Sequence, residues 1–236
     1  MSYTAESFLT KIKPMVIADM KKSGILASLT AAQAFIESNK GNSGLTEKAN
    51  NLFGIKGTYN GESVKMLTTE YYNGVAHKVY ANFRKYPSWV ESIADHSALF
   101  NRLARYSNLR GCKDWKLATK YVKDDGYATS PTYTSTLQNT ILKYKLYEWD
   151  DEVIDEQSKE NPYKQPDTQI DFNELDESIR WVQQALINSG YPIFVTGIPD
   201  AVTQGAILDF QKKHGLKIDG IVGNNTISAL LKASKE

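Results

Sequence analysis

A chain of 236 residues in which 41% of the side chains are hydrophobic is long enough to form two domains with ordinary cores. Its single cysteine, Cys112, excludes an intramolecular disulfide, and its three histidines are too scattered for a zinc-type ligand spacing. We therefore expect no metal and no cofactor.

The formal net charge is only +1, but the charges are unevenly distributed. Basic side chains exceed acidic ones over residues 1–149, and acidic side chains dominate residues 150–177. A basic N-terminal half favours an anionic polymer, and nucleic acid, anionic lipid and bacterial wall all qualify. Because no nucleic-acid-binding motif is present, we expect no nucleic acid as a partner. No apolar stretch is long enough for a secretory signal or a membrane span, so we expect neither membrane insertion nor export by the signal-peptide route.

The first predicted helix runs from Thr4 to Gly24, with Pro14 marking a kink or a restart. The next predicted helix lies in residues 29–43, LTAAQAFIESNKGNS, with Thr30 as its expected N-cap. Its apolar residues form one stripe, and Gln33 and Glu37 lie one turn apart along the edge of that stripe.

The Asn39–Ser43 tail is rich in residues that tolerate left-handed backbone, so it should end the second helix and leave Glu37 at the lip of a cleft. A carboxyl group in half-apolar surroundings has a raised pKa and can donate a proton near neutral pH. The alternative is a glutamate that merely solvates the edge of the helix.

The segment 49–57 is predicted to be a compact loop, and β-branched and aromatic residues then predict a hairpin of Ser63–Tyr71 and Ala76–Phe83. Glu70 lies near the end of the first strand, where it either contributes to a site or simply faces solvent. Helical periodicity returns at Ser88, over 115–122 and over 137–146. The turn-rich segment 125–133 between the last two helices contains Tyr127 and Tyr133. These tyrosines are expected either to pack in the core or to line a cleft.

Residues 150–174 combine acidic side chains and prolines with few large apolar residues, which predicts a linker between a domain of residues 1–149 and one of residues 175–236. The C-terminal domain should contain three small helices around one core. It also contains a weak internal repeat, in which residues 196–203 and 219–226 each read as a turn followed by a helix.

Five motifs in the first domain together resemble glycoside hydrolase family 73, the endo-β-N-acetylglucosaminidase domain of bacterial wall hydrolases. They are AQAFIES (32–38), NNLFGIK (50–56), TTEY (68–71), FRKY (83–86) and GYAT (126–129). The C-terminal domain resembles the type 1 peptidoglycan-binding domain through VQQAL (182–186), FQKKHGL (210–216) and DGIVGNNT (219–226). Both halves therefore point to bacterial peptidoglycan as the partner.

The resemblance implies an α+β, mainly helical fold: a lysozyme-like catalytic domain with a small β-hairpin lobe, followed by a three-helix domain. Its implied activity is cleavage of the β-1,4 bond between N-acetylglucosamine and N-acetylmuramic acid. Glu37 matches the catalytic acid, Glu70 the second carboxylate proposed in some members, and Tyr127 the motif tyrosine. Further residues expected to bind substrate are Asn51, Phe53, Tyr71 and Tyr133.

Two positions depart from the family pattern: Ser130 replaces an aspartate, and Asn39 replaces a glycine. Asparagine tolerates a left-handed turn, whereas the loss of an acid at Ser130 leaves less electrostatic support around Tyr127.

If Glu37 donates the proton, the reaction can be completed in two alternative ways. Either Glu70 activates a water on the opposite face of the sugar, or the 2-acetamido oxygen of the substrate attacks first. Rival interpretations are a muramidase or lytic transglycosylase on a similar fold, and a wall-binding structural protein of a phage tail without catalysis. The two-part layout predicts a monomer, either a phage endolysin held in the host cytoplasm until holin-dependent release or a bacterial autolysin at the cell wall.

Overall fold

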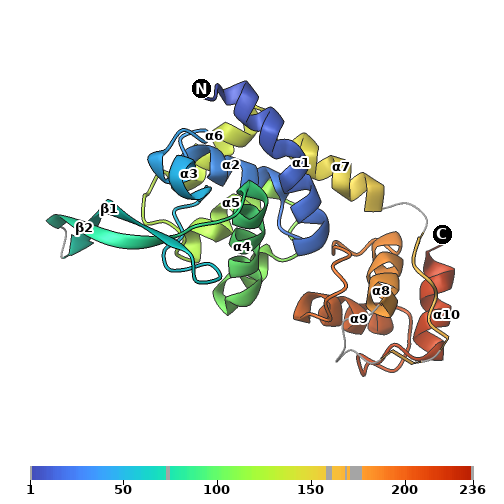
Figure 1. The fold of residues 1–236 in the computed structure, drawn as a ribbon. Coiled ribbons are helices and arrows are strands. Elements are labelled where there is room, and N and C mark those ends of the chain that lie inside the picture. The colour runs from blue at the N-terminus through green and yellow to red at the C-terminus, as the bar shows by residue number, and fades with distance from the viewer. Residues whose placement is uncertain (1, 73–74, 158–160, 168, 171–176, 235–236) are drawn as a thin grey trace.

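The computed structural model describes residues 2–72, 75–157, 161–167, 169–170 and 177–234, and in this part of the chain the fold is mainly helical with one two-stranded sheet (Figure 1). Buried side chains gather in two clusters, one within residues 8–153 and one within residues 170–230, with Phe194 joining the first cluster. The predicted fold class is confirmed. No described helix is both long and apolar enough to cross a membrane.

The helix α1 (Ala5–Ser23) begins and ends where the sequence predicts. Thr4 and Ser7 form a reciprocal capping box at its start, and Gly24 ends it with a left-handed φ of 72°. The helix continues through Pro14 without a restart. These signals are local in sequence, which explains why this element was predictable.

The helix α2 (Ala27–Glu37) begins three residues before the expected cap, so the prediction that Thr30 is the N-cap is wrong. Thr30 is buried inside the helix. The backbone N–H of Ser28 donates instead to Oδ1 of Asp150, at 2.8 Å, from a helix more than a hundred residues later. A carboxylate at a helix N-terminus satisfies a free amide and opposes the positive end of the helix dipole.

The turn after α2 has the left-handed backbone that the sequence predicts, with φ of 50° at Asn39 and 77° at Gly41. A side chain at Gly41 would stand 2.8 Å from the ring of Trp89, so both its conformation and its space require glycine. The chain then enters the short helix α3 (Gly44–Ala49). This tight reversal leaves Glu37 as the last residue of α2.

The strands β1 (Ser63–Tyr72) and β2 (Val75–Arg84) form the predicted hairpin to within one residue at each end, with Glu70 paired to His77. Its base is held to the helices by Asp95, which accepts from Arg84 at 2.5 Å and from the hydroxyl of Tyr86 at 2.7 Å. Beyond that base the hairpin extends away from the helical body (Figure 1).

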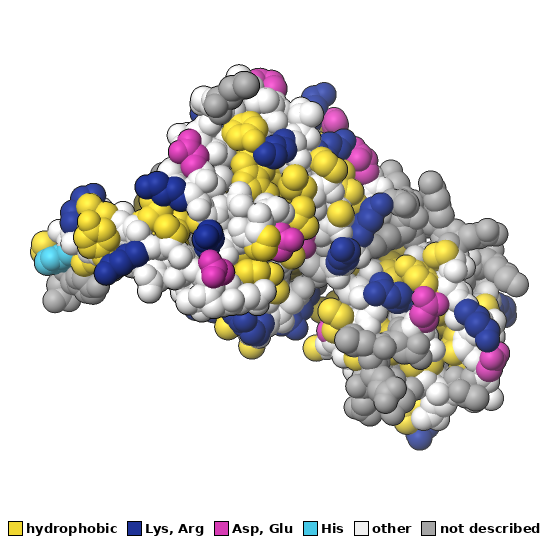
Figure 2. All heavy atoms as spheres, viewed as in Figure 1, with side chains coloured by type: hydrophobic (Ala, Val, Ile, Leu, Met, Phe, Trp, Pro, Cys, Tyr) yellow, Lys and Arg dark blue, Asp and Glu magenta, His cyan; other side chains and the backbone are white. Residues whose placement is uncertain are grey.

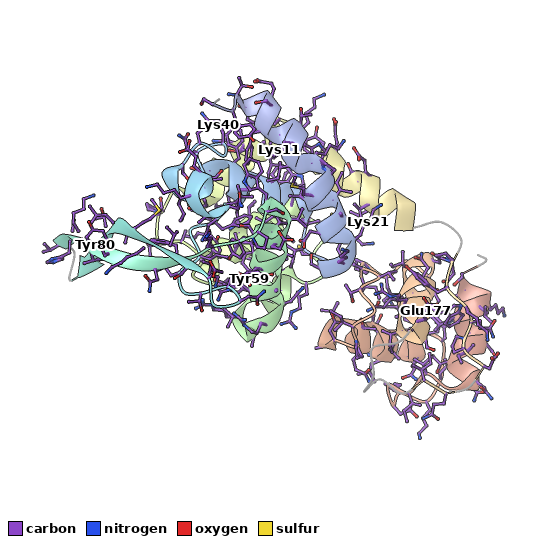
Figure 3. All side chains as sticks on the ribbon, in the orientation of Figure 1. Lys11, Lys21, Lys40, Tyr59, Tyr80 and Glu177 are labelled. Carbon is purple, nitrogen blue, oxygen red and sulfur yellow. The ribbon has the colours of Figure 1, made fainter. Side chains whose placement is uncertain are left out.

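The outer part of the hairpin exposes apolar and basic side chains to solvent (Figure 2). Tyr80, labelled in Figure 3, is 67% exposed, and the ammonium of Lys65 lies 5.6 Å from the centre of its ring. Lys78 donates to Thr69 across the two strands. A cationic and aromatic surface of this kind suits contact with an extended anionic ligand.

Five elements complete the first domain: α4 (Trp89–Arg102), the 3-10 helix η1 (Ala104–Leu109), α5 (Trp115–Asp124), α6 (Tyr133–Lys143) and α7 (Tyr147–Gln157). Ser88 caps α4, as its place at the start of the periodicity predicts. The helix α6 begins four residues before the predicted start at 137 and ends at Lys143.

The structure moves the first domain boundary, because residues 150–157 belong to α7 and are not a linker. Val153 is fully buried in the first core and Asp150 is 2% exposed, while acidic neighbours such as Asp151 face solvent. An acidic helix can pack stably on a domain when one of its faces is buried against the other helices. Residues 158–160, 168 and 171–174 of the predicted linker lie outside the described part.

The second domain contains the three predicted helices, α8 (Glu177–Asn188), α9 (Ala201–Lys213) and α10 (Asn224–Ala233). Residues 161–167 and 169–170 also pack with this domain, since Ile170 is buried in its core and donates its N–H to the carbonyl of Val222. Asn161 donates to the carbonyl of Trp181. Much of the predicted linker therefore lies against one of the two domains.

The weak sequence repeat corresponds to a repeated hydrogen-bond pattern. The buried amide of Gln183 accepts from the N–H groups of Thr196 and Gly197 and donates to the hydroxyl of Thr203. Gln211 plays the same part in the second copy. Its amide oxygen accepts from the N–H groups of Asp219 and Gly220, and its amide nitrogen donates to the hydroxyl of Thr226. Each buried glutamine thus fixes one turn to the helix that follows it.

Candidate active site

Glu37 lies where α2 ends, and its side chain remains open to solvent at the surface. The hydroxyl of Tyr133, at the start of α6, donates to Oε1 of Glu37 at 3.1 Å. Burial of the carboxyl against neighbouring protein atoms raises its pKa, and the hydrogen bond from Tyr133 lowers it, with a net pKa above the ordinary value. A carboxyl in this state holds its proton to a higher pH than an exposed glutamate.

Gln33, one turn before Glu37 on α2, completes a hydrogen-bonded chain. Its Nε2 donates to the hydroxyl oxygen of Tyr133 at 3.0 Å, and the Gln33 side chain is fully buried. Because that hydroxyl accepts from Gln33, its own proton is directed to Glu37. The one-turn spacing of Gln33 and Glu37 is visible in the sequence, but the tyrosine that joins them comes from another helix.

Tyr127 stands beside this chain, with its ring stacked on that of Tyr133 at 6.1 Å between centroids. Burial, together with the nearby Tyr133 and Glu37, raises its pKa well above the usual range, so the hydroxyl stays protonated. The structure therefore brings Glu37, Tyr127 and Tyr133 together, as predicted. The side chains of Gln33 and Tyr133 are also available to hold the carboxyl in place.

A buried histidine, to which the sequence alone assigns no role at the site, forms the layer behind Tyr127. His96 of α4 is fully buried, stacks on Phe53 at 3.8 Å and meets the rings of Phe100 and Tyr127 edge-on. Burial lowers its pKa to about 3, which keeps the imidazole neutral. Since an uncharged ring packs among aromatic rings without an ionic cost, His96 acts as a spacer for Tyr127.

Two residues expected to bind substrate have internal roles instead. Asn51 is 1% exposed, and its side chain is saturated by hydrogen bonds to the backbone of the 51–55 loop and of Arg84. Phe53 is 5% exposed and packs on His96. A side chain needs an open face to touch a sugar, so we correct both assignments to positions that shape the loop beside the site.

The side chains of Glu70 and Tyr71 lie outside the described residues, but the backbone places both in the outer half of the hairpin. Met66 on the same strand packs beside Gly44 of α3, and Glu70 follows four residues further out. At the usual strand rise this is about 13 Å beyond Met66 along the strand. Among the described side chains, no carboxylate contributes to the pKa of Glu37.

The described residues contain no cluster of three or more histidine, cysteine, aspartate or glutamate side chains that could hold a metal ion. What they contain is one carboxyl of raised pKa at the end of a buried helix, oriented by a tyrosine and bordered by a second one. A carboxyl of this kind performs general acid catalysis on an oxygen leaving group. Helical fold and site together define a glycoside hydrolase.

Comparison with known proteins gives the family. The model for mannosyl-glycoprotein endo-beta-N-acetylglucosaminidase matches residues 13–146, more than half of the chain, and the chain belongs to this glucosaminidase family. Residues 176–230 match the model for a peptidoglycan binding domain. The predicted resemblance of both halves is confirmed.

The relatives of this chain include a glucosaminidase and a peptidoglycan hydrolase. The exo-glucosaminidase LytG of Bacillus subtilis is 40% identical over 136 residues, which are 56% of this chain and 48% of that protein. The peptidoglycan hydrolase FlgJ of Escherichia coli K12 is 34% identical over 147 residues, covering 60% and 47%. The chain thus spans about half the length of these relatives.

A solved structure resembles the first domain. The catalytic domain of the autolysin Auto from Listeria monocytogenes superposes with a TM-score of 0.57 at 34% identity, over 63% of this chain and 90% of that one. The lysozyme-like arrangement that the sequence predicts is therefore confirmed by the fold as well as by the family.

Proposed function

We propose that the chain hydrolyses peptidoglycan at the β-1,4 bond between N-acetylglucosamine and N-acetylmuramic acid, with Glu37 as the general acid. The observation that carries the proposal is the raised pKa of a solvent-open carboxyl held by the hydroxyl of Tyr133. The family to which the chain belongs and the names of its relatives support the choice of polymer.

In the first step Glu37 gives its proton to the glycosidic oxygen as the bond to the N-acetylglucosamine ring breaks. Positive charge develops on that ring, and the carboxylate left on Glu37 is stabilised by the donated hydrogen bond from Tyr133. The Tyr127 hydroxyl, which stays protonated, can donate to the substrate acetamido group or hold a water.

The second step is completed from the opposite face of the sugar. In one route Glu70 activates a water, which requires the outer half of the hairpin to bend over the substrate because Glu70 lies four residues beyond Met66 on β1. In the other, the 2-acetamido oxygen of the substrate attacks and Glu70 is dispensable for bond formation. The anomeric configuration of the first product, followed by NMR, separates the routes, since inversion requires the first and retention the second.

The bond itself is tested by reducing digested purified wall with borohydride. Reduced glucosamine at the new chain ends is the expected result. Reduced muramic acid would replace the proposal by a muramidase, anhydro-muramic acid ends would indicate a lytic transglycosylase, and no new ends at all would leave a wall-binding protein without catalysis.

We also propose that residues 161–234 hold the enzyme on peptidoglycan, which the match to a peptidoglycan binding domain supports. Tethering a binding domain to a hydrolase raises the local concentration of an insoluble substrate. Sedimentation of the full chain with purified walls tests this, with protein remaining in the supernatant as the contrary result.

A further inference from the structure

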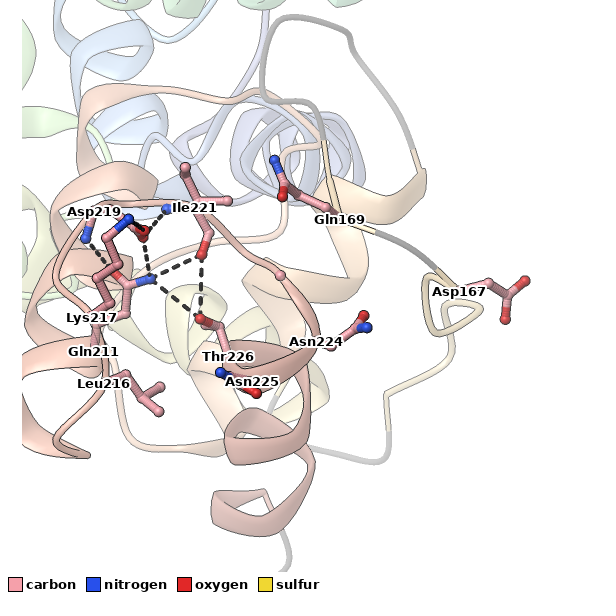
Figure 4. Close-up of a pocket in the computed structure, with 11 residues that line it drawn as sticks. Asp167, Gln169, Gln211, Leu216, Lys217, Asp219, Ile221, Asn224, Asn225 and Thr226 are labelled. Carbon is pink, nitrogen blue, oxygen red and sulfur yellow. Dashed lines mark hydrogen bonds and ion pairs between the residues drawn. The ribbon is translucent and has the colours of Figure 1, made fainter.

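A groove of about 510 Å³ opens on the C-terminal domain between the start of α10 and the segment that carries Asp167 and Gln169 (Figure 4). Its floor is formed by Gln211 and the turn that Gln211 fixes. The hydrogen bond from Ile170 to Val222 holds the two walls together. The groove is therefore built from ordered hydrogen bonds and exists before any ligand enters.

Polar groups with unused hydrogen-bonding capacity face this groove. Asn224 and Asn225 line it, are exposed, and make no side-chain hydrogen bond to another described residue. Asn224 projects toward the segment with Gln169 and Asp167 (Figure 4). The ammonium of Lys217, also in the lining, lies 3.2 Å from the carboxylate of Asp219.

The internal repeat shows that one difference between its copies opens the groove. In the first copy Asp200 caps α9 by accepting from the N–H of Thr203 at 2.8 Å. The equivalent position in the second copy is Gly223, and α10 has no side-chain cap. The first amides of α10 are thus left to an external acceptor, and the space of the missing cap belongs to the groove.

The lining chemistry favours peptide over sugar. None of the described residues that line the groove is aromatic, whereas sugar sites commonly offer an aromatic ring as a stacking surface. The groove offers instead uncapped amides and a lysine for a carboxylate, two asparagine side chains for peptide groups, and Asp167 for an amine. The peptide part of peptidoglycan carries all three of these groups.

We propose that this groove binds the peptide stems of peptidoglycan, with a peptide carboxylate received at the start of α10 beside Lys217. The inference deepens the proposed wall binding and rests on it. It assigns recognition of the glycan to the catalytic cleft and recognition of the peptide to the second domain.

The test titrates the full-length protein with a synthetic stem tetrapeptide that ends in a free carboxylate, followed by amide chemical shifts in NMR spectra. Saturable shifts at residues 217–226 are expected. The same peptide with an amidated C-terminus should bind about tenfold more weakly, because a charge-assisted hydrogen bond is lost. Equal binding of the two peptides, or shifts confined to the first domain, would overturn the proposal.

The variant Asn225→Asp supplies a control against misfolding. A carboxylate in the first turn of α10 stabilises the helix but repels a bound carboxylate, so affinity for the tetrapeptide should fall about tenfold while thermal stability is kept. Asn108→Asp makes the same change on an exposed residue of η1 and should bind as the wild type does. Unchanged peptide affinity in Asn225→Asp would contradict the assignment.

Digestion of purified walls distinguishes this inference from the function on which it rests. If walls are bound and cut but the tetrapeptide does not bind at 217–226, the groove assignment fails and the proposed function stands. If walls are neither bound nor cut, both fail.

Discussion

A single hydroxyl decides how the Glu37 carboxyl is held. Burial raises the pKa of Glu37, and the hydrogen bond from Tyr133 counteracts part of that rise. The carboxyl is thereby kept acidic enough to give up its proton and close enough to a fixed donor to keep one orientation. Gln33 fixes the tyrosine in turn, at 3.0 Å.

Replacing Glu37 by glutamine removes the proton and preserves the shape of the side chain. We expect hydrolysis of purified walls to fall by about 10²–10⁴-fold, the usual contribution of a general acid, while sedimentation with walls is unchanged. The exposed Glu47→Gln on α3 serves as the matched control. Activity of Glu37→Gln within tenfold of the wild type would exclude Glu37 as the acid.

The variant Tyr133→Phe tests the hydrogen bond from Tyr133 to Glu37 through the dependence of the hydrolysis rate on pH. In the proposed reaction Glu37 must be protonated, so the rate should fall as pH rises through the pKa of Glu37. Because the Tyr133 hydroxyl stabilises the ionised carboxylate, its removal should raise that pKa further and move the alkaline limb of the profile to higher pH, with a rate about tenfold lower at the optimum.

Tyr144→Phe is the control for this profile, since the Tyr144 ring packs on Phe35 and its hydroxyl has no hydrogen bond among the described residues. Its profile should superimpose on that of the wild type. An alkaline limb that stays in place in Tyr133→Phe would show that the hydroxyl does not act on Glu37.

At the scale of elements, the start of α2 is determined by α7. Asp150 is buried and accepts from the N–H of Ser28, and its burial raises its pKa to about 7. In the unfolded chain this pKa is close to 3.8. The folded protein therefore binds the proton more tightly, and the contribution of Asp150 to stability is greatest below pH 4 and is lost as pH rises to about 7.

Asp150→Asn and Asp150→Ala separate the charge from the cap. The asparagine variant keeps the acceptor oxygen and removes the titration, so its free energy of unfolding should vary less between pH 4 and 7 than that of the wild type. The alanine variant removes the cap and should lose about 1 kcal/mol of stability. Urea unfolding at several pH values measures both.

The exposed neighbour Asp151→Asn should match the wild type in the same unfolding experiment. If Asp150→Asn retains the full pH dependence of the wild type, the titration belongs to another group, of which buried Asp19, with its pKa raised to about 6, is the first candidate.

Comparison of the helices shows which boundaries a sequence predicts. The ends of α1 and the start of α4 are set by capping residues next to the helix, Thr4, Gly24 and Ser88, and the sequence predicted the helix boundaries at these positions. The start of α2 was not predictable because its cap comes from Asp150. The same helix α7 was mistaken for linker, because its composition is acidic and only Val153 and a few neighbours face the core.

At the scale of the whole molecule, Phe194 connects the two domains. It belongs by sequence to the C-terminal domain, but it is 3% exposed and lies in the core cluster of the first. The ammonium of Lys113 is 5.8 Å from the centre of its ring, and a side chain at Gly24 would touch it. Through this contact a residue of the second domain packs into the core of the first.

Phe194→Asp should break the contact, since a carboxylate in an apolar interface is costly to desolvate. We expect the radius of gyration from small-angle X-ray scattering to increase and thermal unfolding to divide into two transitions. Ile218→Asp changes a 57% exposed residue of the same domain in the same way and should do neither. A scattering curve identical to that of the wild type would refute a fixed arrangement of the domains.

Sequence alone determined the class of each domain and the hairpin, and it proposed Glu37, Tyr127 and Tyr133 for the site, because periodicity, turn residues and short motifs act over a few neighbouring positions. It did not reveal that Tyr133 holds Glu37, that Asn51 and Phe53 face inward, or that Asp150 starts α2. These facts depend on partners far apart in the chain, and burial and hydrogen bonds between such partners are set only when the helices pack. The groove at α10 has the same origin: its asparagines are visible in the sequence, but the wall opposite them, which carries Asp167 and Gln169, exists only once Ile170 is bonded to Val222.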